Sequence, residues 1–303
     1  METFDDLVPE INELRRQRKA IILSHYYQRP EIQDIADFVG DSLELSRKAA
    51  SNDAEVIVFC GVHFMAESAA ILSPDKIVLL PDLRATCPLA DMAGAASLRS
   101  RKAELDSPVV VSYVNTTADV KAESDICCTS ANAIRVIESI PPERQILFVP
   151  DRNLGAYVAK QTGRELVLWP GFCCIHDELE PGEVFEARRR YPEALVLVHP
   201  ECRPEVVALA DKVASTSGML RFVEESDARE FIIGTEEGLT YQMSKRCPCK
   251  KFYLLSNGLV CDTMKLITLP KVRDALKNLE PRITVPEHTR RRALRALERM
   301  LAI

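Results

Sequence analysis

Short, continuous apolar runs recur along the chain, and most are followed by a segment with helical patterning. Because these runs do not alternate apolar with polar residues, they indicate buried parallel strands. The expected strands cover residues 20–23, 55–59, 77–80, 109–112, 146–149, 166–169, 195–198, 231–233 and 252–255. Helical patterns between them include residues 42–50, 132–140, 154–161 and 204–213. Repeated β-α-β units of this kind predict an α/β fold.

Polar residues and cysteines return along the chain with a period close to 87 residues. One set ends apolar runs, with separations of 88 and 86 residues: His25, Tyr113 and His199. A hydroxyl set follows 17 residues later, where helices are expected to begin: Ser42, Ser130 and Thr216. A cysteine set has separations of 86 and 88 residues: Cys87, Cys173 and Cys261. Three sets that share nearly one period predict three related structural units.

The repeat predicts an α/β protein of three pseudo-threefold-related α/β/α domains, with small parallel sheets around a central active-site cleft. The expected domains are residues 1–97 with a C-terminal helix at 268–303, residues 98–183, and residues 184–267. Ligands of open α/β sheets bind beyond the carboxyl ends of the strands. The three sets should therefore meet in one central site.

Composition limits the classes of partner. The 39 basic and 45 acidic residues give a net charge of -6, which argues against a nucleic-acid partner. The N-terminus lacks the basic start and apolar run of a signal peptide, and the most apolar stretch, residues 55–72, is too short to span a membrane. We expect a cytoplasmic protein with no membrane partner and reduced thiols. Of its ten cysteines, Cys60, Cys127 and Cys128 are expected to be core residues.

The three sets have distinct chemical uses. Three thiolates can hold an iron-sulfur cubane and leave its fourth iron open as a Lewis acid, but the wide spacing alone predicts only a metal site. Hydroxyls at helix starts fit a dicarboxylate or a phosphate, whereas each alone would be read as an ordinary solvent-facing cap. The strand-end set, with Tyr27, Asn115 and Glu201 two residues further on, suggests general acid-base chemistry.

Several longer motifs match one known family. They include His25-Tyr26-Tyr27-Gln28, Gly40-Asp41-Ser42-Leu43, Trp169-Pro170-Gly171-Phe172-Cys173, His199-Pro200-Glu201-Cys202 and Cys261-Asp262-Thr263-Met264-Lys265. Over residues 20–276 the chain resembles the quinolinate synthases, the A proteins of bacterial NAD biosynthesis. The resemblance implies a transferase that condenses iminoaspartate with dihydroxyacetone phosphate to quinolinate, with loss of phosphate and water. It also implies that L-aspartate oxidase or aspartate dehydrogenase supplies the iminoaspartate.

The resemblance further implies one [4Fe-4S] cluster with three cysteine ligands and one open iron. By motif, the ligands fall on Cys87, Cys173 and Cys261. The family pattern G-x-C-x-x-H matches residues 171–176, which favours Cys173 over Cys174 and makes His176 a neighbouring site residue. The pair Cys247 and Cys249 is expected not to ligate the cluster, and whether it is a redox pair stays open.

The family's substrate-binding positions fall on His25, Ser42, Tyr113, Asn115, Ser130, His176, His199, Glu201 and Thr216. Catalytic roles are expected for His25, Tyr27, His199 and Glu201, with Glu201 as an acid/base and Tyr27 in ring closure. Two alternatives stay open. One is an iron-sulfur hydro-lyase acting on a hydroxy acid, and the other is a three-domain binding protein whose cysteines hold structural zinc.

Overall fold

Three four-stranded parallel sheets form the framework of residues 4–303, the part of the chain that this computed structural model describes. The first sheet contains β1 (Ala20–His25), β2 (Phe38–Gly40), β3 (Val56–Cys60) and β4 (Ile77–Leu79). The second contains β5 (Val109–Tyr113), β6 (Ile126–Cys128), β7 (Ile146–Val149) and β8 (Val167–Leu168). The third contains β9 (Leu195–Val198), β10 (Lys212–Val213), β11 (Glu230–Gly234) and β12 (Lys251–Leu254).

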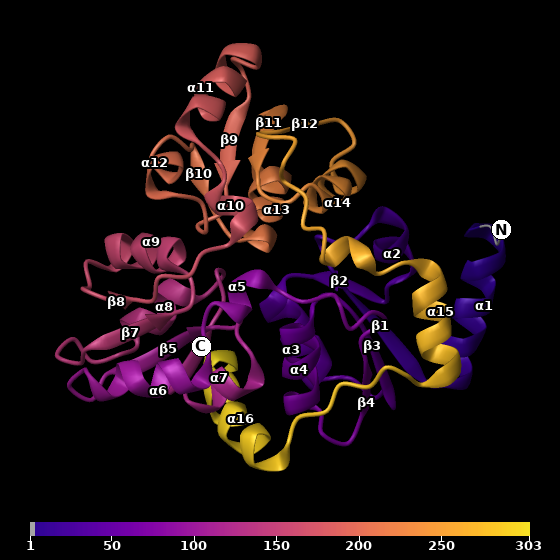
Figure 1. The fold of residues 1–303 in the computed structure, drawn as a ribbon. Helices are drawn as coiled ribbons and strands as arrows, with labels where there is room; N and C mark the ends of the chain where they lie inside the picture. The colour runs from indigo at the N-terminus through magenta and orange to yellow at the C-terminus, as the bar shows by residue number, and fades with distance from the viewer. Residues whose placement is uncertain (1–3) are drawn as a thin grey trace.

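The order of strands is the same in every sheet: β2-β1-β3-β4, β6-β5-β7-β8 and β10-β9-β11-β12. Figure 1 shows the sheets as three lobes around a common centre. The expected fold class, three small parallel α/β/α units, is confirmed.

Helices flank the sheets of each lobe (Figure 1). Those of the first lobe are α1 (Phe4–Gln17), α2 (Pro30–Ile35), α3 (Ser42–Ala50), α4 (His63–Leu72) and α5 (Pro88–Asp91). Helix α6 (Ala95–Ala103) packs on the second sheet, where Leu98 joins the apolar cluster of Val110 and Leu147. Those that follow are α7 (Ala118–Ala122), α8 (Ala133–Glu138), α9 (Arg152–Thr162), α10 (Cys174–Asp177) and α11 (Pro181–Arg190). The last are α12 (Pro204–Val207), α13 (Thr216–Glu225), α14 (Gly238–Arg246), the 3-10 turn η1 (Met264–Leu266), α15 (Leu269–Asn278) and α16 (Glu287–Leu301).

One hydrogen bond repeats in all three lobes and gives the repeat a physical basis. The carboxylate of Asp37 accepts a hydrogen bond from the backbone N–H of Ile22 at 2.8 Å. Asp125 accepts one from Val110 at 2.8 Å, and Asp211 accepts one from Val196 at 2.7 Å. These aspartates lie 88 and 86 residues apart, the separations of the strand-end and hydroxyl sets. Each ties the start of an edge strand to the central strand beside it.

The expected central strands are all present, but three edge strands were not predicted. They are β2, β6 and β10, which contain only two or three residues each. The expected helix at residues 204–213 is wrong in its second half, because α12 ends at Val207 and β10 begins at Lys212. The three missed strands lie in apolar runs of at most three residues, whereas the equally short β4 and β8 lie in the four-residue runs 77–80 and 166–169.

The C-terminal segment joins two lobes. Helix α15 packs against α1, and α16 packs against α4, α7 and β6. Side-chain hydrogen bonds also hold α16, including those from Thr289 to Asp119 at 3.1 Å and from Asn132 to the carbonyl of Met300 at 3.3 Å. One apolar core accordingly runs through the first two sheets and both helices. The third lobe has its own apolar cores on the two faces of its sheet. The domain boundaries stay a prediction.

Within residues 4–303, no helix combines the length and the apolar composition that crossing a bilayer requires. Cys60, Cys127 and Cys128 are completely buried, which confirms them as core residues.

Candidate active site

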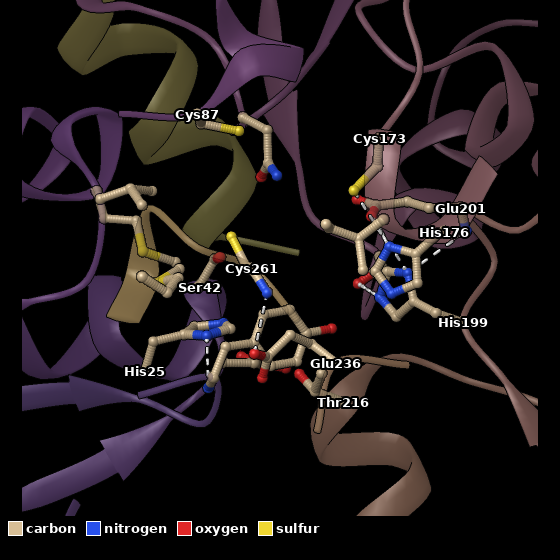
Figure 2. A pocket seen from close by; sticks show the side chains of 18 of the residues that line it. His25, Ser42, Cys87, Cys173, His176, His199, Glu201, Thr216, Glu236 and Cys261 are labelled. Carbon is tan, nitrogen blue, oxygen red and sulfur yellow. Dashed lines mark hydrogen bonds and ion pairs between the residues drawn. The ribbon is translucent and has the colours of Figure 1, made fainter. Parts of the chain in front are cut away.

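A cavity lies where the three lobes meet, and it holds about 680 Å³ of space that is partly open to solvent. Every site residue predicted from the sequence lines it: His25, Tyr27, Ser42, Cys87, Tyr113, Asn115, Ser130, Cys173, His176, His199, Glu201, Thr216 and Cys261. Figure 2 shows most of these side chains turned toward the same interior space. Cys174, Cys247 and Cys249 do not line the cavity.

The three lining cysteines come from equivalent loops. Cys87 and Cys173 are the N-cap residues of α5 and α10, and Cys261 precedes η1. All three are free thiols, and Figure 2 shows their sulfur atoms facing the cavity. Burial raises the pKa of each thiol, and backbone N–H groups at the following turns oppose this effect without outweighing it. The three thiols therefore favour their protonated form in this structure.

Two buried carboxylates hold the backbone of the second and third cysteines, and the sequence analysis missed both. Asp151 accepts a hydrogen bond from the N–H of Cys173 at 3.1 Å, and Glu236 accepts one from the N–H of Cys261 at 3.2 Å. Lys265 pairs with Glu236 at 2.8 Å. Both acids are completely buried and stand two residues after a strand end, a position that could have drawn attention to them.

The hydroxyl set does not cap its helices. The caps of α3 and α13 are Asp41 and Ser215, whereas Ser42 and Thr216 are the first helical residues and face the cavity. Ser130 lies in the turn before α8, and its hydroxyl is 3.2 Å from Nε2 of His199. The alternative reading, in which each hydroxyl is an ordinary cap that faces solvent, is therefore wrong.

Two strand-end histidines repeat one local geometry. Nδ1 of His25 accepts a hydrogen bond from the N–H of Tyr27 at 3.1 Å, and Nδ1 of His199 accepts one from the N–H of Glu201 at 3.3 Å. Burial lowers the pKa of each histidine to about 3, so both rings are neutral at physiological pH. Since Nδ1 accepts, the single ring proton belongs on Nε2.

Glu201 is the centre of a buried polar cluster. Its Oε2 lies 2.7 Å from Nδ1 of His176 and 3.6 Å from Nδ1 of His199. Burial favours protonation, but His199 and His176 outweigh it and hold the pKa of Glu201 at about 2. The same burial, reinforced by the charge of Glu201, raises the pKa of the Tyr113 hydroxyl well above its ordinary value. The cluster thus contains a carboxylate base beside neutral donors.

Thr235 links two site residues that were predicted from the sequence and that lie in different lobes, but Thr235 itself was not predicted. Its hydroxyl lies 2.7 Å from the Tyr27 hydroxyl and 2.9 Å from Nε2 of His176. Both nitrogens of His176 therefore have protein partners. Burial and the Glu201 charge raise the pKa of Tyr27 well above its ordinary value, so Tyr27 keeps its proton.

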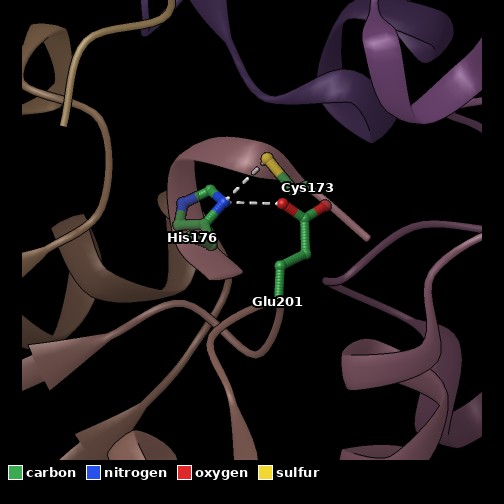
Figure 3. A group of neighbouring side chains, drawn as sticks. All are labelled: Cys173, His176 and Glu201. Atoms are coloured by element: carbon green, nitrogen blue, oxygen red, sulfur yellow. Dashed lines mark hydrogen bonds and ion pairs between the residues drawn. The ribbon is translucent and has the colours of Figure 1, made fainter. Parts of the chain in front are cut away.

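Cys173, His176 and Glu201 also offer three ligand atoms within 4.8 Å of one another (Figure 3). Nδ1 of His176 is 3.3 Å from the sulfur of Cys173. The group could hold a metal ion. Two further acceptors in the cavity wall are buried without a hydrogen-bond partner among residues 4–303, Oδ1 of Asn115 and Oε1 of Glu201. Such atoms are usually satisfied by a bound polar group.

Comparison with known proteins gives one consistent result. Residues 9–302 match the family model described as quinolinate synthetase A protein. The chain is 77% identical over 303 residues to a quinolinate synthase of Desulforudis audaxviator, with 100% of both chains covered. It is 56% identical over 297 residues to a quinolinate synthase of Methanoregula boonei, with 98% of each chain covered. A quinolinate synthase of Dehalococcoides mccartyi is 54% identical over 294 residues, with 97% of each chain covered.

Proposed function

The chain belongs to the quinolinate synthetase A protein family, and we propose that it makes quinolinate for NAD biosynthesis by condensing iminoaspartate with dihydroxyacetone phosphate. One observation carries the proposal. Thiols, hydroxyls, imidazoles and carboxylates from all three lobes line a single cavity. A reaction that joins two anionic substrates and then removes water needs anion-binding groups and acid-base groups in one place.

For the metal, we propose Cys87, Cys173 and Cys261 as ligands of one [4Fe-4S] cluster with an open iron. Three free, desolvated thiols that face one cavity fit such a group, because bound iron relieves the cost of burying thiolates. The cluster supplies a Lewis acid when bound. His176 is assigned to proton transfer instead, because Glu201 and Thr235 already occupy its two nitrogens.

The substrates' charged groups are assigned to the polar wall of the cavity. Ser42, Ser130 and Thr216 donate their hydroxyl protons to carboxylate or phosphate oxygens. His25 presents its Nε2–H toward a substrate oxygen, because its Nδ1 is engaged by the backbone. The unpartnered Oδ1 of Asn115 accepts a hydrogen bond from a substrate nitrogen or hydroxyl.

Proton movement is assigned to two groups. Glu201, ionised beside His176 and His199, accepts a proton from the substrate and returns it to a leaving hydroxyl. Tyr27 keeps its proton and can donate it at the ring-closing step. Protonated Glu201 can replace that proton along His176 and the Thr235 hydroxyl, which leaves Glu201 ionised again.

The decisive test incubates anaerobically purified protein with dihydroxyacetone phosphate and iminoaspartate, generated from L-aspartate by an oxidase or a dehydrogenase. We expect chromatography to detect quinolinate. Water loss from a hydroxy acid without quinolinate would support a hydro-lyase instead. A colourless protein with zinc but neither iron nor sulfide would support a binding protein and refute the synthase.

A further inference from the structure

A second hollow lies on the other side of the segments that carry the hydroxyl set. It is lined by Tyr26, Asp41, Leu43, Glu44, Arg47, Ala131, Arg135, Ser217, Leu220, Arg221 and Arg246. Leu43, Ala131 and Ser217 each directly follow one of the hydroxyl residues that line the inner cavity. Asp41 lines both spaces. The segments that lead into α3, α8 and α13 therefore form the wall between the inner cavity and this outer hollow.

Three arginines of the outer hollow are equivalent in the internal repeat. Arg47, Arg135 and Arg221 each lie five residues after a member of the hydroxyl set, and they are separated by 88 and 86 residues. They project from α3, α8 and α13, which come from the three different lobes (Figure 1). We call these three residues the arginine ring. Arg246 of α14 adds a fourth guanidinium beside it.

Four arginines and two acids line the hollow, so its positive charge exceeds its negative charge. Asp41 and Glu44 are the acids in the hollow, and both already accept backbone N–H groups at the start of α3. Asp41 also accepts from Ser217 at 2.5 Å, and Glu44 lies 3.3 Å from the Tyr26 hydroxyl.

Among the guanidinium groups, Arg246 pairs with Glu224 at 3.3 Å, and Arg135 donates to the carbonyl of Ile303 at 2.9 Å. Within residues 4–303, Arg47 and Arg221 have exposed side chains with no ion pair or hydrogen bond. The ring is thus a local cationic surface on a chain whose net charge is -6.

We propose that the arginine ring is an outer anion site, which binds the phosphate monoester of dihydroxyacetone phosphate and so raises the concentration of this substrate beside the inner cavity. The inference rests on the proposed function. Planar guanidinium groups bind phosphate in a bidentate fashion, and a cationic surface raises the local concentration of an anionic substrate. Each arginine of the ring lies five residues after a member of the hydroxyl set, so the outer site and the inner anion-binding groups are carried by the same three segments.

The test uses the holoenzyme and its Arg47→Gln and Arg221→Gln variants, singly and together, with iminoaspartate saturating. Arg135 is left intact because its side chain holds the C-terminus. Arg189→Gln is the matched control, because the exposed Arg189 side chain on α11 does not line the outer hollow. We expect the double variant to lose roughly three- to tenfold in kcat/KM for dihydroxyacetone phosphate at low salt, with kcat changed less than about twofold. Added salt should reduce the difference, because it screens the ring.

Two results would overturn the inference: an unchanged kcat/KM and salt dependence in the double variant, or a lower kcat with unchanged kcat/KM, which would assign the ring to release of product phosphate. Iron content of each variant confirms that the cluster is intact. Binding of inorganic phosphate, followed by phosphorus NMR, separates this inference from the proposed function. If wild type makes no quinolinate, the function fails, while weaker phosphate binding by the double variant still supports the outer anion site.

Discussion

Nδ1 of His176 lies 2.7 Å from Oε2 of Glu201, and both side chains are at least 96% buried. His176 comes from α10, whereas Glu201 follows β9 in the next lobe. A buried carboxylate is costly unless a donor faces it, and here Nδ1–H of His176 supplies that compensation. The contact therefore keeps a buried carboxylate ionised.

Replacing this base tests its role. We expect Glu201→Gln to lower kcat by about 100-fold or more, because the amide cannot accept a proton at neutral pH. Initial rates of quinolinate formation measure the effect. Glu205→Gln, on the exposed side of α12, should retain normal rates. Normal turnover of Glu201→Gln with full iron content would refute the assignment.

The cluster ligands can be tested by composition rather than activity. We expect Cys87→Ala, Cys173→Ala and Cys261→Ala each to lose most of the iron and acid-labile sulfide after anaerobic purification, because three thiolates are needed to hold the cluster. Cys174→Ala is the matched control, since it neighbours Cys173 but does not line the cavity. Loss of iron from the Cys174 variant together with full iron in the Cys173 variant would reverse the assignment.

Gly238 tests the contact between the first and third lobes. A Cβ at this position would lie 2.7 Å from the carbonyl oxygen of Tyr26 and 2.9 Å from backbone atoms of Tyr27. Backbone atoms cannot move aside without strain, so Gly238→Ala should lower the free energy of unfolding by about 1–3 kcal/mol. It should also displace Tyr27 and thereby lower kcat. Thermal unfolding and rates measure both effects. Gly182→Ala, which has open space around its Cβ, should change neither.

Asp82 should make stability depend on pH. Its carboxylate pairs with Arg84 at 2.8 Å and with Lys271 of α15 at 2.7 Å, and these partners hold its pKa below the ordinary value of 3.8. A carboxyl with a lowered pKa stabilises the folded state above the unfolded pKa, and the effect is lost as pH falls through the folded value. We expect Asp82→Asn to lower the free energy of unfolding by about 1–3 kcal/mol near pH 7.

Urea unfolding of wild type and Asp82→Asn, near pH 7 and at about pH 3, measures this effect. The difference between the two proteins should shrink at the lower pH. A difference that is the same at both pH values would show that the carboxylate charge is not its source. Asp227→Asn, at an exposed position, serves as the control and should match wild type throughout.

Central strands and the repeat could be predicted because each leaves a local signal. Runs such as residues 195–198 are long enough to read as buried strands, and the positions of Ser42, Ser130 and Thr216 repeat at a fixed interval. The edge strand β10 could not be predicted, because Lys212 and Val213 do not belong to a continuous apolar run, whereas the equally short β8 lies in the apolar run 166–169. The hydroxyl residues were predicted at helix starts, but only the structure shows that Asp41 and Ser215 cap α3 and α13.

The site shows the same division. Residues in recognisable motifs, including Glu201 and the ligand candidate Cys173, were found from the sequence and line the cavity. Thr235 was not found from the sequence, because its partner Tyr27 lies 208 residues away and no local pattern connects the two positions. Asp151 and Glu236 were missed for a similar reason, since their carboxylates act on backbone N–H groups more than 20 residues further along the chain.

The sequence by itself determined the α/β class, the threefold repeat and a set of candidate residues that line one cavity, because apolar runs, periods and motifs are properties of local order along the chain. Only the tertiary structure decided how the lobes meet. That meeting places Thr235 between Tyr27 and His176, and it arranges Arg47, Arg135 and Arg221 around a second hollow. Contacts between lobes depend on the packing of whole sheets and helices, and no short segment encodes that packing.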